Sequence, residues 1–396
     1  MPQSSTTRSA TAPLRRVYLD RNLQINFGVT LMAILSVSSI IPALPLMVSH
    51  FAIGKAEVGL IVTAFTLPGI LAAPLGGILA DRFGRKQVLV PCLFVFAAFG
   101  TACFFAQDMA TLLVLRFFQG LGAGPVSNIN VTIIGDLYDG RERAAAMGYN
   151  GSVLSIGTAA FPALGGMLAM VGWQYPFLLP ALAVPLGLVV AFGLKTPEVK
   201  SSENFGTYLK TAARQMRKPR ALSLFGVSLV TFIVLYGGIV TYLPVLLHDR
   251  FGSSPAAIGW IVAASSGVTA LAASQLGRLT RWLRPGQMML AAFAFYALAM
   301  LMVPLMPTAA WCILPICFFG LAQGLNVPNL LTILSGLADT RHRAAFMAIN
   351  GMVLRLGQTL GPVVMGVAYA LGGLWAVYST AASLALVMLA LALWGG

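Results

Sequence analysis

The sequence predicts an all-α integral membrane protein in which twelve transmembrane helices form two six-helix pseudo-repeats. Three observations carry this prediction: the composition, the spacing of apolar runs and an internal repeat. Hydrophobic residues make up 58% of the 396-residue chain and charged residues only 9%, whereas ordinary soluble domains contain about 25% charged residues. So few charges cannot cover a surface exposed to water. A disordered chain is excluded as well, because disordered chains are poor in hydrophobic residues.

A membrane-spanning helix needs about 20 mostly apolar residues, and twelve runs of this kind follow one another along the chain. None of them shows the apolar/polar alternation of a barrel strand, so each predicts a helix. The runs cover residues 25–48, 57–79, 87–106, 111–134, 144–168, 173–194, 221–247, 257–276, 288–306, 309–334, 344–370 and 374–394. They predict an N-terminal cytoplasmic tail (1–24), a first six-helix bundle (25–194), a basic cytoplasmic linker (195–220) and a second six-helix bundle (221–396).

The loop charges predict the orientation. The net charge is +14, and a basic chain can bind nucleic acid, but here the basic residues are scattered between apolar runs. With the N-terminus inside, cytoplasmic segments hold 21 of the 25 Lys and Arg residues, and periplasmic loops hold Lys55 and Arg250. Since basic loop residues remain cytoplasmic, we expect a multi-pass protein of a bacterial inner membrane, with both termini in the cytoplasm and no nucleic-acid partner.

The two bundles are related in sequence at an offset of 200 residues. Between positions 118 and 166 the shifted chain gives 20 identities in 49 positions without a gap, far more than a shared apolar composition produces. The matches include loop arginines, Arg141 with Arg341 and Arg143 with Arg343. The repeat predicts two bundles of common ancestry in parallel orientation.

A charged motif joins the second and third runs: Gly77-Ile-Leu-Ala-Asp81-Arg82-Phe-Gly84-Arg85-Lys86. In it a glycine allows close helix approach, a second glycine turns the chain, and one acid among three basic residues can form a cytoplasmic charge latch. Asp136, at the inner end of the fourth run, is placed to pair with Arg82 or Arg85. The repeat and this motif closely resemble the major facilitator superfamily, over nearly the whole chain. The resemblance implies that Asp81 caps a helix of the opposite bundle when the carrier is open outward.

Two further motifs resemble the twelve-helix drug:H+ antiporter branch of that superfamily. The first run contains Leu35-Ser-x5-Pro42-Ala-Leu-Pro45, and the fifth contains Gly157-Thr-Ala-Ala-Phe161-Pro162-Ala-Leu-Gly165-Gly166, where Phe161 replaces a glycine of the antiporter pattern. Glycines let helices approach closely and proline bends a helix; ordinary packing is the alternative. The positions expected at the seam between the bundles are Gly157, Pro162, Gly166, Gly357, Gly361 and Pro362.

Two arginines lie within predicted spans, Arg116 in the fourth and Arg355 in the eleventh, and no acidic residue occupies a mid-span position. A charge inside the bilayer faces the protein interior or a wet cavity. Arginine cannot carry a proton as an acid does, but it binds a carboxylate or phosphate through a bidentate pair. A structural role is the alternative for both arginines. With the polar residues at the same depth they predict a substrate cavity lined by Arg355, Arg116, Ser38, Ser39, Asn128, Asn130, Tyr236, Gln323, Asn326 and Gln358.

These observations predict a secondary active transporter that works by alternating access. The resemblance implies an exporter that exchanges small amphipathic organic compounds, drugs or metabolites, for protons, and the arginines favour an anionic substrate. An uptake symporter or an organic-anion exchanger on the same fold stays open. Glu57, at the outer end of the second run, is the better of two candidates for proton coupling, and Asp136 is the other. The alternative for Glu57 is an ordinary acid at a helix N-terminus.

The sequence indicates neither an enzyme nor a cofactor. No constellation of His, Asp and Glu lies at membrane depth, and the three histidines and four cysteines lack metal-ligand spacing. A phosphate-binding loop is also missing, so ATP is not the expected source of energy. We expect a monomeric carrier whose partners are its small-molecule substrate, protons and membrane lipid.

Overall fold

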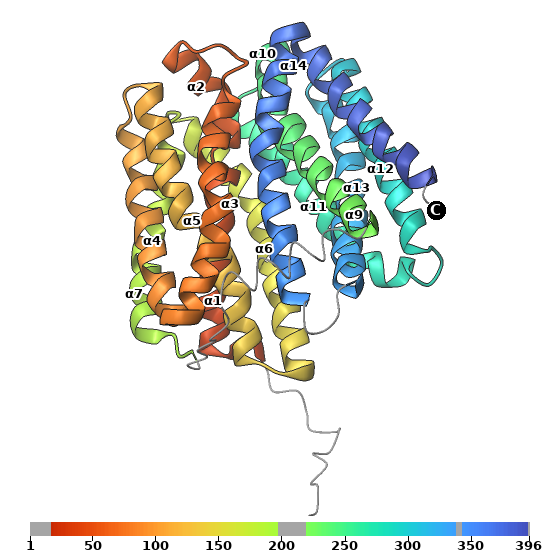
Figure 1. Ribbon diagram of the computed structural model, residues 1–396. Helices are drawn as coiled ribbons and strands as arrows, with labels where there is room; N and C mark the ends of the chain where they lie inside the picture. Colours follow the sequence, from red (N-terminus) through yellow and green to blue (C-terminus); the bar gives the residue numbers. More distant parts are fainter. Residues whose placement is uncertain (1–16, 197–218, 338–342, 395–396) are drawn as a thin grey trace, which may run out of the picture.

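The computed structural model describes residues 17–196, 219–337 and 343–394. Within these ranges the chain folds into long helices that stand side by side as two bundles (Figure 1). Most of the predicted tail and of the predicted basic linker lie outside the described residues. The boundaries of those two regions therefore remain predictions.

The first bundle contains six spans, preceded by the short η1 (Val17–Leu19). Several spans are built from more than one helical segment, because proline or a tight turn interrupts the α-helix. The spans are α1 (Arg21–Ser38) with η2 (Ile41–Ala43) and α2 (Leu44–Phe51); α3 (Gly59–Phe83); α4 (Arg85–Ala102) with η3 (Cys103–Phe105); α5 (Met109–Leu137); α6 (Gly140–Ala169); and η4 (Tyr175–Leu182) with α7 (Ala183–Gly193).

The second bundle repeats this pattern. Its segments are α9 (Pro219–Val234) with η5 (Leu235–Tyr242) and α10 (Leu243–Phe251); α11 (Pro255–Leu279); α12 (Pro285–Met302) with η6 (Val303–Leu305); η7 (Ala310–Cys312) with α13 (Ile313–Leu337); and α14 (Arg343–Trp394). The 52 residues of α14 would extend about 78 Å as one straight helix, more than twice the roughly 30 Å hydrocarbon core. The backbone leaves helical geometry at Gly372 and Gly373, and the chain turns back there (Figure 1). The described residues thus form twelve membrane-length spans, as predicted.

The helices begin and end a few residues away from the predicted runs, and at two of these boundaries the local reason is clear. The helix α1 begins at Arg21, inside the predicted tail, because the Asp20 side chain caps it by accepting a hydrogen bond from the Asn22 N–H at 2.8 Å. The helix α3 continues to Phe83 and ends at Gly84, whose φ of +106° is open to glycine but strained for other residues. The turn in the charged motif is therefore made by this glycine.

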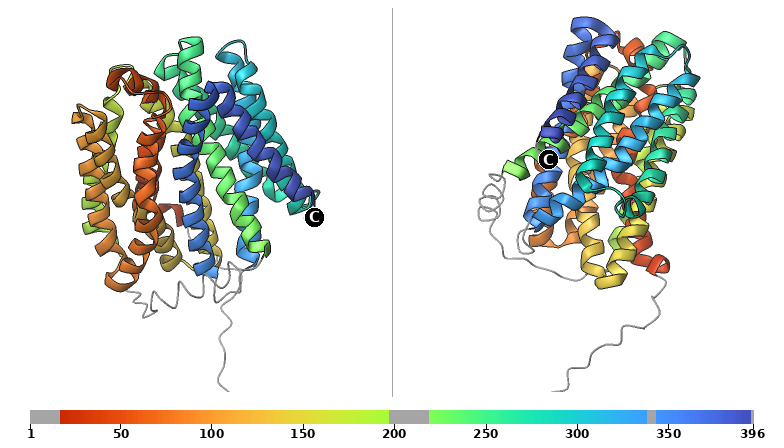
Figure 2. Two further views of the ribbon diagram at one scale, coloured as in Figure 1. Left: turned by 45° about the horizontal axis from the view of Figure 1, so that its top comes forward. Right: turned by 90° about the vertical axis from the view of Figure 1, so that its right-hand side faces the viewer.

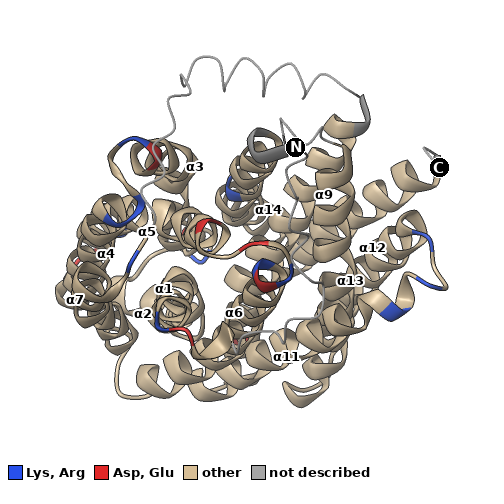
Figure 3. Cartoon of the chain, turned by 90° about the horizontal axis from the view of Figure 1, so that it is seen from below, with Lys and Arg blue, Asp and Glu red and all other residues tan. Residues whose placement is uncertain are grey.

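The helix ends define two faces of the protein. We call the face formed by residues 81–86, 138–143, 195–196 and 278–285 the basic face, because described Lys and Arg side chains gather there (Figure 3). The other ends, at residues 52–58, 106–108, 170–174, 252–254, 306–309 and 372–373, form the opposite face. The two bundles stand next to each other between these faces (Figure 2).

Apolar packing is continuous between the bundles near the opposite face. One core cluster contains Met47 and Val62 of the first bundle together with Tyr242, Leu246 and Met365 of the second. A separate cluster, centred on residues such as Leu93 of α4, belongs to the first bundle alone. Burial of apolar surface therefore holds the two bundles together mainly on the side of the opposite face.

Candidate substrate cavity

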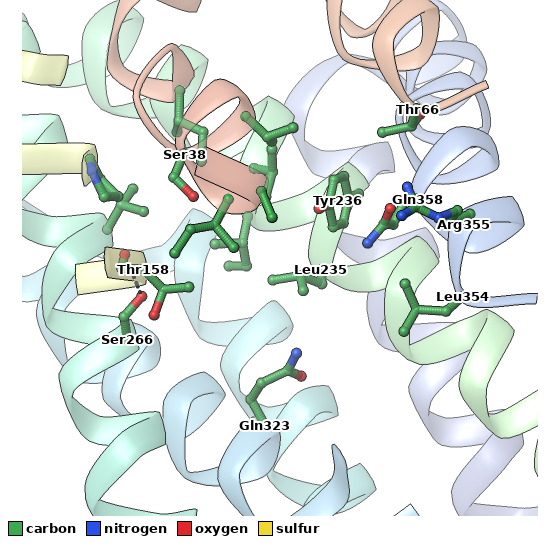
Figure 4. A pocket seen from close by; sticks show the side chains of 18 of the residues that line it. Ser38, Thr66, Thr158, Leu235, Tyr236, Ser266, Gln323, Leu354, Arg355 and Gln358 are labelled. Carbon is green, nitrogen blue, oxygen red and sulfur yellow. Dashed lines mark hydrogen bonds between the residues drawn. The ribbon is translucent and has the colours of Figure 1, made fainter. Parts of the chain in front are cut away.

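A cavity of about 450 Å³ lies between the two bundles. Segments of both contribute to it: α1, α3, α5 and α6 from the first, and η5, α11, α13 and α14 from the second. Apolar side chains form most of its wall. The polar and charged side chains that line it are Ser38, Thr66, Ser127, Asn128, Thr158, Tyr236, Ser265, Ser266, Thr269, Gln323, Arg355 and Gln358 (Figure 4).

Arg355 is the one charged side chain among the described residues that line the cavity. It projects from α14, and Gln358 lies beside it one turn further along the helix, with Tyr236 close by (Figure 4). Its Nη2 donates a hydrogen bond to the Gly124 carbonyl of α5 at 3.0 Å. The remaining guanidinium donors can therefore serve a bound molecule.

Tyr236 reaches the cavity from a widened helical turn. Residues Leu235–Tyr242 form a π-helix, which is typical of functional sites. Within this turn the Tyr236 carbonyl accepts a hydrogen bond from the Thr241 hydroxyl, at 2.7 Å.

Six of the ten side chains predicted to bind substrate line the cavity. They are Ser38, Asn128, Tyr236, Gln323, Arg355 and Gln358. The other four, Ser39, Arg116, Asn130 and Asn326, are buried within one bundle and do not line it. We therefore leave those four out of the proposed binding site.

Arg116 is enclosed by the first bundle, with no exposed surface. It donates hydrogen bonds to the Ile61 carbonyl at 3.3 Å, to Gln119 Oε1 at 2.8 Å and to the carbonyl and hydroxyl of Ser36. The ring of Phe65, which lines the cavity, lies 4.4 Å from the guanidinium carbon. These contacts tie α5 to α1 and α3, which is the structural role left open as the alternative.

The buried asparagines also join helices of their own bundles. Asn130 of α5 donates to the Thr30 hydroxyl of α1 at 2.5 Å, and that hydroxyl donates to Asn150 Oδ1 of α6 at 2.5 Å. In the second bundle, Asn326 of α13 donates to the Thr231 hydroxyl of α9 at 2.7 Å. Polar side chains of this kind hold transmembrane helices together, so both asparagines have partners away from the cavity.

Two seams close the bundles against each other, and they are related by the 200-residue repeat. A Cβ atom added at Gly59 of α3 would lie 2.8 Å from Pro362 Cβ of α14, and one added at Gly259 of α11 would lie 2.3 Å from the Pro162 carbonyl oxygen of α6. One seam thus pairs α3 with α14 and the other pairs α11 with α6. Each brings a glycine of one bundle against a proline of the other.

The six predicted seam residues divide into two groups. Pro162, Gly166 and Pro362 contact the other bundle as expected, Gly166 against the Pro255 carbonyl. The other three, Gly157, Gly357 and Gly361, pack against α1 or α9 of their own bundles. The expectation of a seam position does not hold for those three, because a glycine that permits close approach does not specify which neighbouring helix approaches.

Hydrogen bonds and an ion pair join the two bundles along these seams, from the middle of the membrane to the opposite face. Thr359 of α14 accepts from Thr63 at its carbonyl, at 3.1 Å, and donates from its hydroxyl to Thr66 at 3.0 Å. On the second seam, the Ser266 hydroxyl donates to the Thr158 carbonyl at 3.0 Å. At the opposite face, Lys55 Nζ and Asp249 Oδ2 are 2.6 Å apart. The structure is therefore closed toward the opposite face.

The basic-face side is more open. Gly151 of α6 and Gly351 of α14 occupy equivalent repeat positions, and nothing lies within 4 Å of a Cβ atom added at either. Gly351 itself lines the cavity. Access to the cavity in this state is therefore from the basic face.

The charged motif forms an ion-pair cluster within the first bundle. Arg85 is buried; it pairs with Asp81 and its Nε donates to Asp136 Oδ2 at 3.0 Å. Lys86 donates to the Ala191 carbonyl at 2.9 Å, while Arg82 is exposed at the helix end. Nothing lies within 4 Å of a Cβ atom added at Gly77. The close approach expected at Gly77 is thus not made in this state.

Glu57 lies in an exposed turn at the opposite face, outside the cavity. Its Oε2 accepts a hydrogen bond from the Gly54 backbone N–H at 3.0 Å. This is the environment of an ordinary turn-stabilising acid. In the part of the chain that the structure describes, no three His, Cys, Asp or Glu side chains gather as metal ligands.

Sequence reasoning missed several residues of the seams. Gly59 and Gly259 match at the 200-residue offset, as do Ala56 and Ala256. Extending the repeat comparison to the second and eighth runs would have found them. The Lys55–Asp249 ion pair had no such signal, because Lys55 in a turn and Asp249 near the end of α10 do not occupy equivalent positions of the repeat.

Two repeated six-helix bundles around a cavity that is closed toward one face define a twelve-span membrane carrier. The profile of the Major Facilitator Superfamily matches residues 27–362, and the chain belongs to this family. The predicted superfamily and fold are confirmed.

Relatives of the chain include named exporters. It is 27% identical over 254 residues to the bacillibactin exporter of Bacillus subtilis (strain 168), covering 61% of this chain and 63% of that one, less than two thirds of the relative's length. It is 25% identical over 345 residues to Multidrug resistance protein 2 of the same organism, covering 85% and 86%. Among solved structures, a mutant of the nucleoside transporter NupG superposes with a TM-score of 0.81 at 15% identity, covering 94% of this chain and 99% of that one. This last similarity shows the shared fold.

Proposed function

We propose that the protein exports small amphipathic organic anions, drugs or metabolites, across a bacterial inner membrane by alternating access. The basic face is cytoplasmic in this proposal, since basic loop residues remain on that side. The described state is then inward-facing, with the cavity accessible to substrate from the cytoplasm. Both termini lie in the cytoplasm.

The observation that carries the anionic substrate is Arg355. It lines the cavity without a described acidic neighbour there, and a desolvated positive charge without a counter-ion is costly inside a membrane. A carboxylate, sulfonate or phosphate group supplies the missing charge and matches the planar guanidinium donors. Apolar side chains such as Ile34, Phe65 and Phe319 line the rest of the wall, where an aromatic or aliphatic substrate body would pack.

The names of the relatives support export: one is a bacillibactin exporter and the other a multidrug resistance protein. We take a proton gradient as the source of energy, from the family. The absence of mid-span acids in the sequence favours one alternative, the exchange of one organic anion for another, because exchange needs no group that carries a proton.

Ligand binding to the purified protein tests the anionic substrate. Naphthalene-2-sulfonate and naphthalene-2-sulfonamide share one apolar body and differ in charge. We expect the sulfonate to raise the melting temperature and the neutral amide to have little effect. Arg355→Ala should weaken sulfonate binding about 10- to 150-fold, the range for a hydrogen bond to a charged group. Arg355→Lys should recover little of it, because lysine lacks the planar fork.

Arg281→Ala is the matched control, since it removes an exposed arginine outside the cavity. It should bind the sulfonate as the wild type does. Equal binding of sulfonate and amide, or binding that survives Arg355→Ala, would contradict the proposal.

A further inference from the structure

Arg355 belongs to the second bundle, but its side chain contacts two helices of the first. Its Nη2 donates to the Gly124 carbonyl of α5 at 3.0 Å. Its guanidinium also packs over Gly69 of α3, where an added Cβ atom would lie 2.8 Å from Nη1. Among the described residues, Arg355 carries the only charge on the cavity wall. It is also a contact between the bundles in the described state, which we call the closed state because it is closed toward the opposite face.

This contact breaks the symmetry of the repeat. The position equivalent to Arg355 in the first bundle is Ser155, whose hydroxyl bonds to the Gly151 carbonyl of its own helix at 3.0 Å. The corresponding seam is joined by the neutral bond from Ser266 to Thr158. Both seams thus have neutral bonds, and the seam between α3 and α14 also has a charged contact that a ligand can attract.

A backbone carbonyl is a weaker partner for a guanidinium than an anion is, because an anion carries the opposite charge and can accept two parallel N–H···O bonds from the planar fork. An anion in the cavity can accept two parallel N–H bonds from donors of the guanidinium that do not serve Gly124. Its charge attracts the whole guanidinium toward the cavity, and this movement lengthens the bond from Nη2 to the Gly124 carbonyl. In the closed state the anion therefore gives up part of its binding free energy to break this bond.

The bond need not be broken where the bundles have already separated along this seam. The anion then binds more tightly to the state that is open toward the opposite face than to the closed state. Because a ligand shifts an equilibrium toward the state that it binds better, the anion favours the open state. We propose that an anionic substrate switches this carrier: it displaces the Gly124 carbonyl from Arg355 and so favours opening of the opposite face. This inference rests on the proposed function, since it requires an anion in the cavity.

Two substitutions separate the switch from simple binding. In Gly69→Ala the three atoms nearest to the new methyl group would all belong to Arg355, Nη1 at 2.8 Å and Cδ and Cζ at 3.6 Å. It should push the guanidinium off Gly124 while the charge remains in the cavity. Gly267→Ala of α11 is the control, because nothing lies within 4 Å of its added Cβ atom. Arg355→Ala removes both the bond and the charge.

The readout is the distance between spin labels at the opposite face, measured by pulsed electron paramagnetic resonance. Ser49→Cys and Thr308→Cys place the labels at exposed positions of the two bundles, in a protein whose native cysteines have been replaced. We expect naphthalene-2-sulfonate to lengthen this distance in the wild type, and naphthalene-2-sulfonamide to leave it unchanged.

Without ligand, Gly69→Ala should raise the ratio of open to closed molecules about tenfold or more, the range for loss of one charged hydrogen bond, and it should still bind the sulfonate. Arg355→Ala should open the opposite face without ligand and show no response to the sulfonate. In the Arg355→Ala background, Gly69→Ala should cause no further change in the ratio of open to closed molecules. Gly267→Ala should have the wild-type ratio.

Two results overturn the switch and leave the proposed function standing. In one, the sulfonate binds the wild type but the label distance stays the same. In the other, Gly69→Ala keeps the distance distribution of the control. If the sulfonate and the sulfonamide bind equally, or neither binds, the switch and the anionic substrate are both wrong.

Discussion

The substitution Gly259→Ala should prevent the opposite face from closing. The added Cβ atom would lie 2.3 Å from the Pro162 carbonyl oxygen, 3.0 Å from its carbonyl carbon and 3.2 Å from Ala163 Cα. All three are backbone atoms, so no side chain can rotate away. Nonbonded heavy atoms prefer about 3.5 Å, and restoring that separation requires α11 and α6 to move apart by about 1 Å.

Overpacking of this kind costs about 1–3 kcal/mol. Since this clash exists only where the seam is closed, the free energy changes the balance between states, by a factor of about 5 to 150 toward the open opposite face. Gly59→Ala should act in the same direction but more weakly, because its nearest contact with Pro362 is 2.8 Å. Gly267→Ala, on the same helix as Gly259, adds the same methyl group to open space.

The spin-label distance between positions 49 and 308, with transport measured in vesicles, reports the outcome. We expect Gly259→Ala to lengthen the distance and to abolish most transport at near-normal expression, and Gly267→Ala to do neither. A Gly259→Ala protein with the wild-type distance and wild-type transport would refute the reasoning. The close glycine contact would then not control the state of the carrier.

Four smaller predictions concern charged residues. Asp81→Asn should abolish most transport in vesicles with near-normal expression, because Asp81 is the acid of the latch motif; unchanged transport would leave it only a role in the turn. Glu57→Gln should keep both counterflow and pH-driven accumulation, since Glu57 serves its own turn; loss of accumulation alone would make it the proton carrier. Arg116→Ala should lower the free energy of unfolding by about 2–5 kcal/mol, as it empties a fully buried site; a normal melting temperature would contradict this. The hydrogen bond to Asp249 raises the pKa of Lys55 above its usual 10.5. The ion pair therefore stabilises the closed state fully below pH 10.5, and this stabilisation is lost as the pH rises through the raised pKa of Lys55. Asp249→Asn should open the opposite face by no more than about fivefold at neutral pH, as expected for an exposed pair, and a larger shift in label distance would contradict the estimate.

The sequence could predict the spans and the repeat because both depend on composition along one dimension. Twenty apolar residues cross a bilayer wherever their side chains point, and a 200-residue repeat needs no knowledge of contacts. The same reasoning placed Arg116 and Arg355 at membrane depth. Their roles differ because Arg116 points into the first bundle and Arg355 into the cavity.

Direction around a helix axis was the missing information. In a membrane both the lipid-facing and the protein-facing sides are apolar, so periodicity indicates weakly which side is buried. For this reason depth alone selected Ser39, Asn130 and Asn326 together with the true lining residues, and motif glycines such as Gly157 were assigned to the seam. The Gly259–Pro162 contact could be found only by pairing equivalent positions of the two repeats.

Transport in everted membrane vesicles tests most directly whether the carrier exports anions through Arg355. In such vesicles the cytoplasmic side faces the medium, and an acidic lumen provides the gradient for exchange with protons. Naphthalene-2-sulfonate stays ionised and does not follow the pH difference by itself. Wild-type vesicles should accumulate it, whereas Arg355→Ala vesicles should not, and neither should accumulate the sulfonamide. Equal accumulation by the Arg355→Ala protein, or accumulation of an organic cation in place of the sulfonate, would contradict the account.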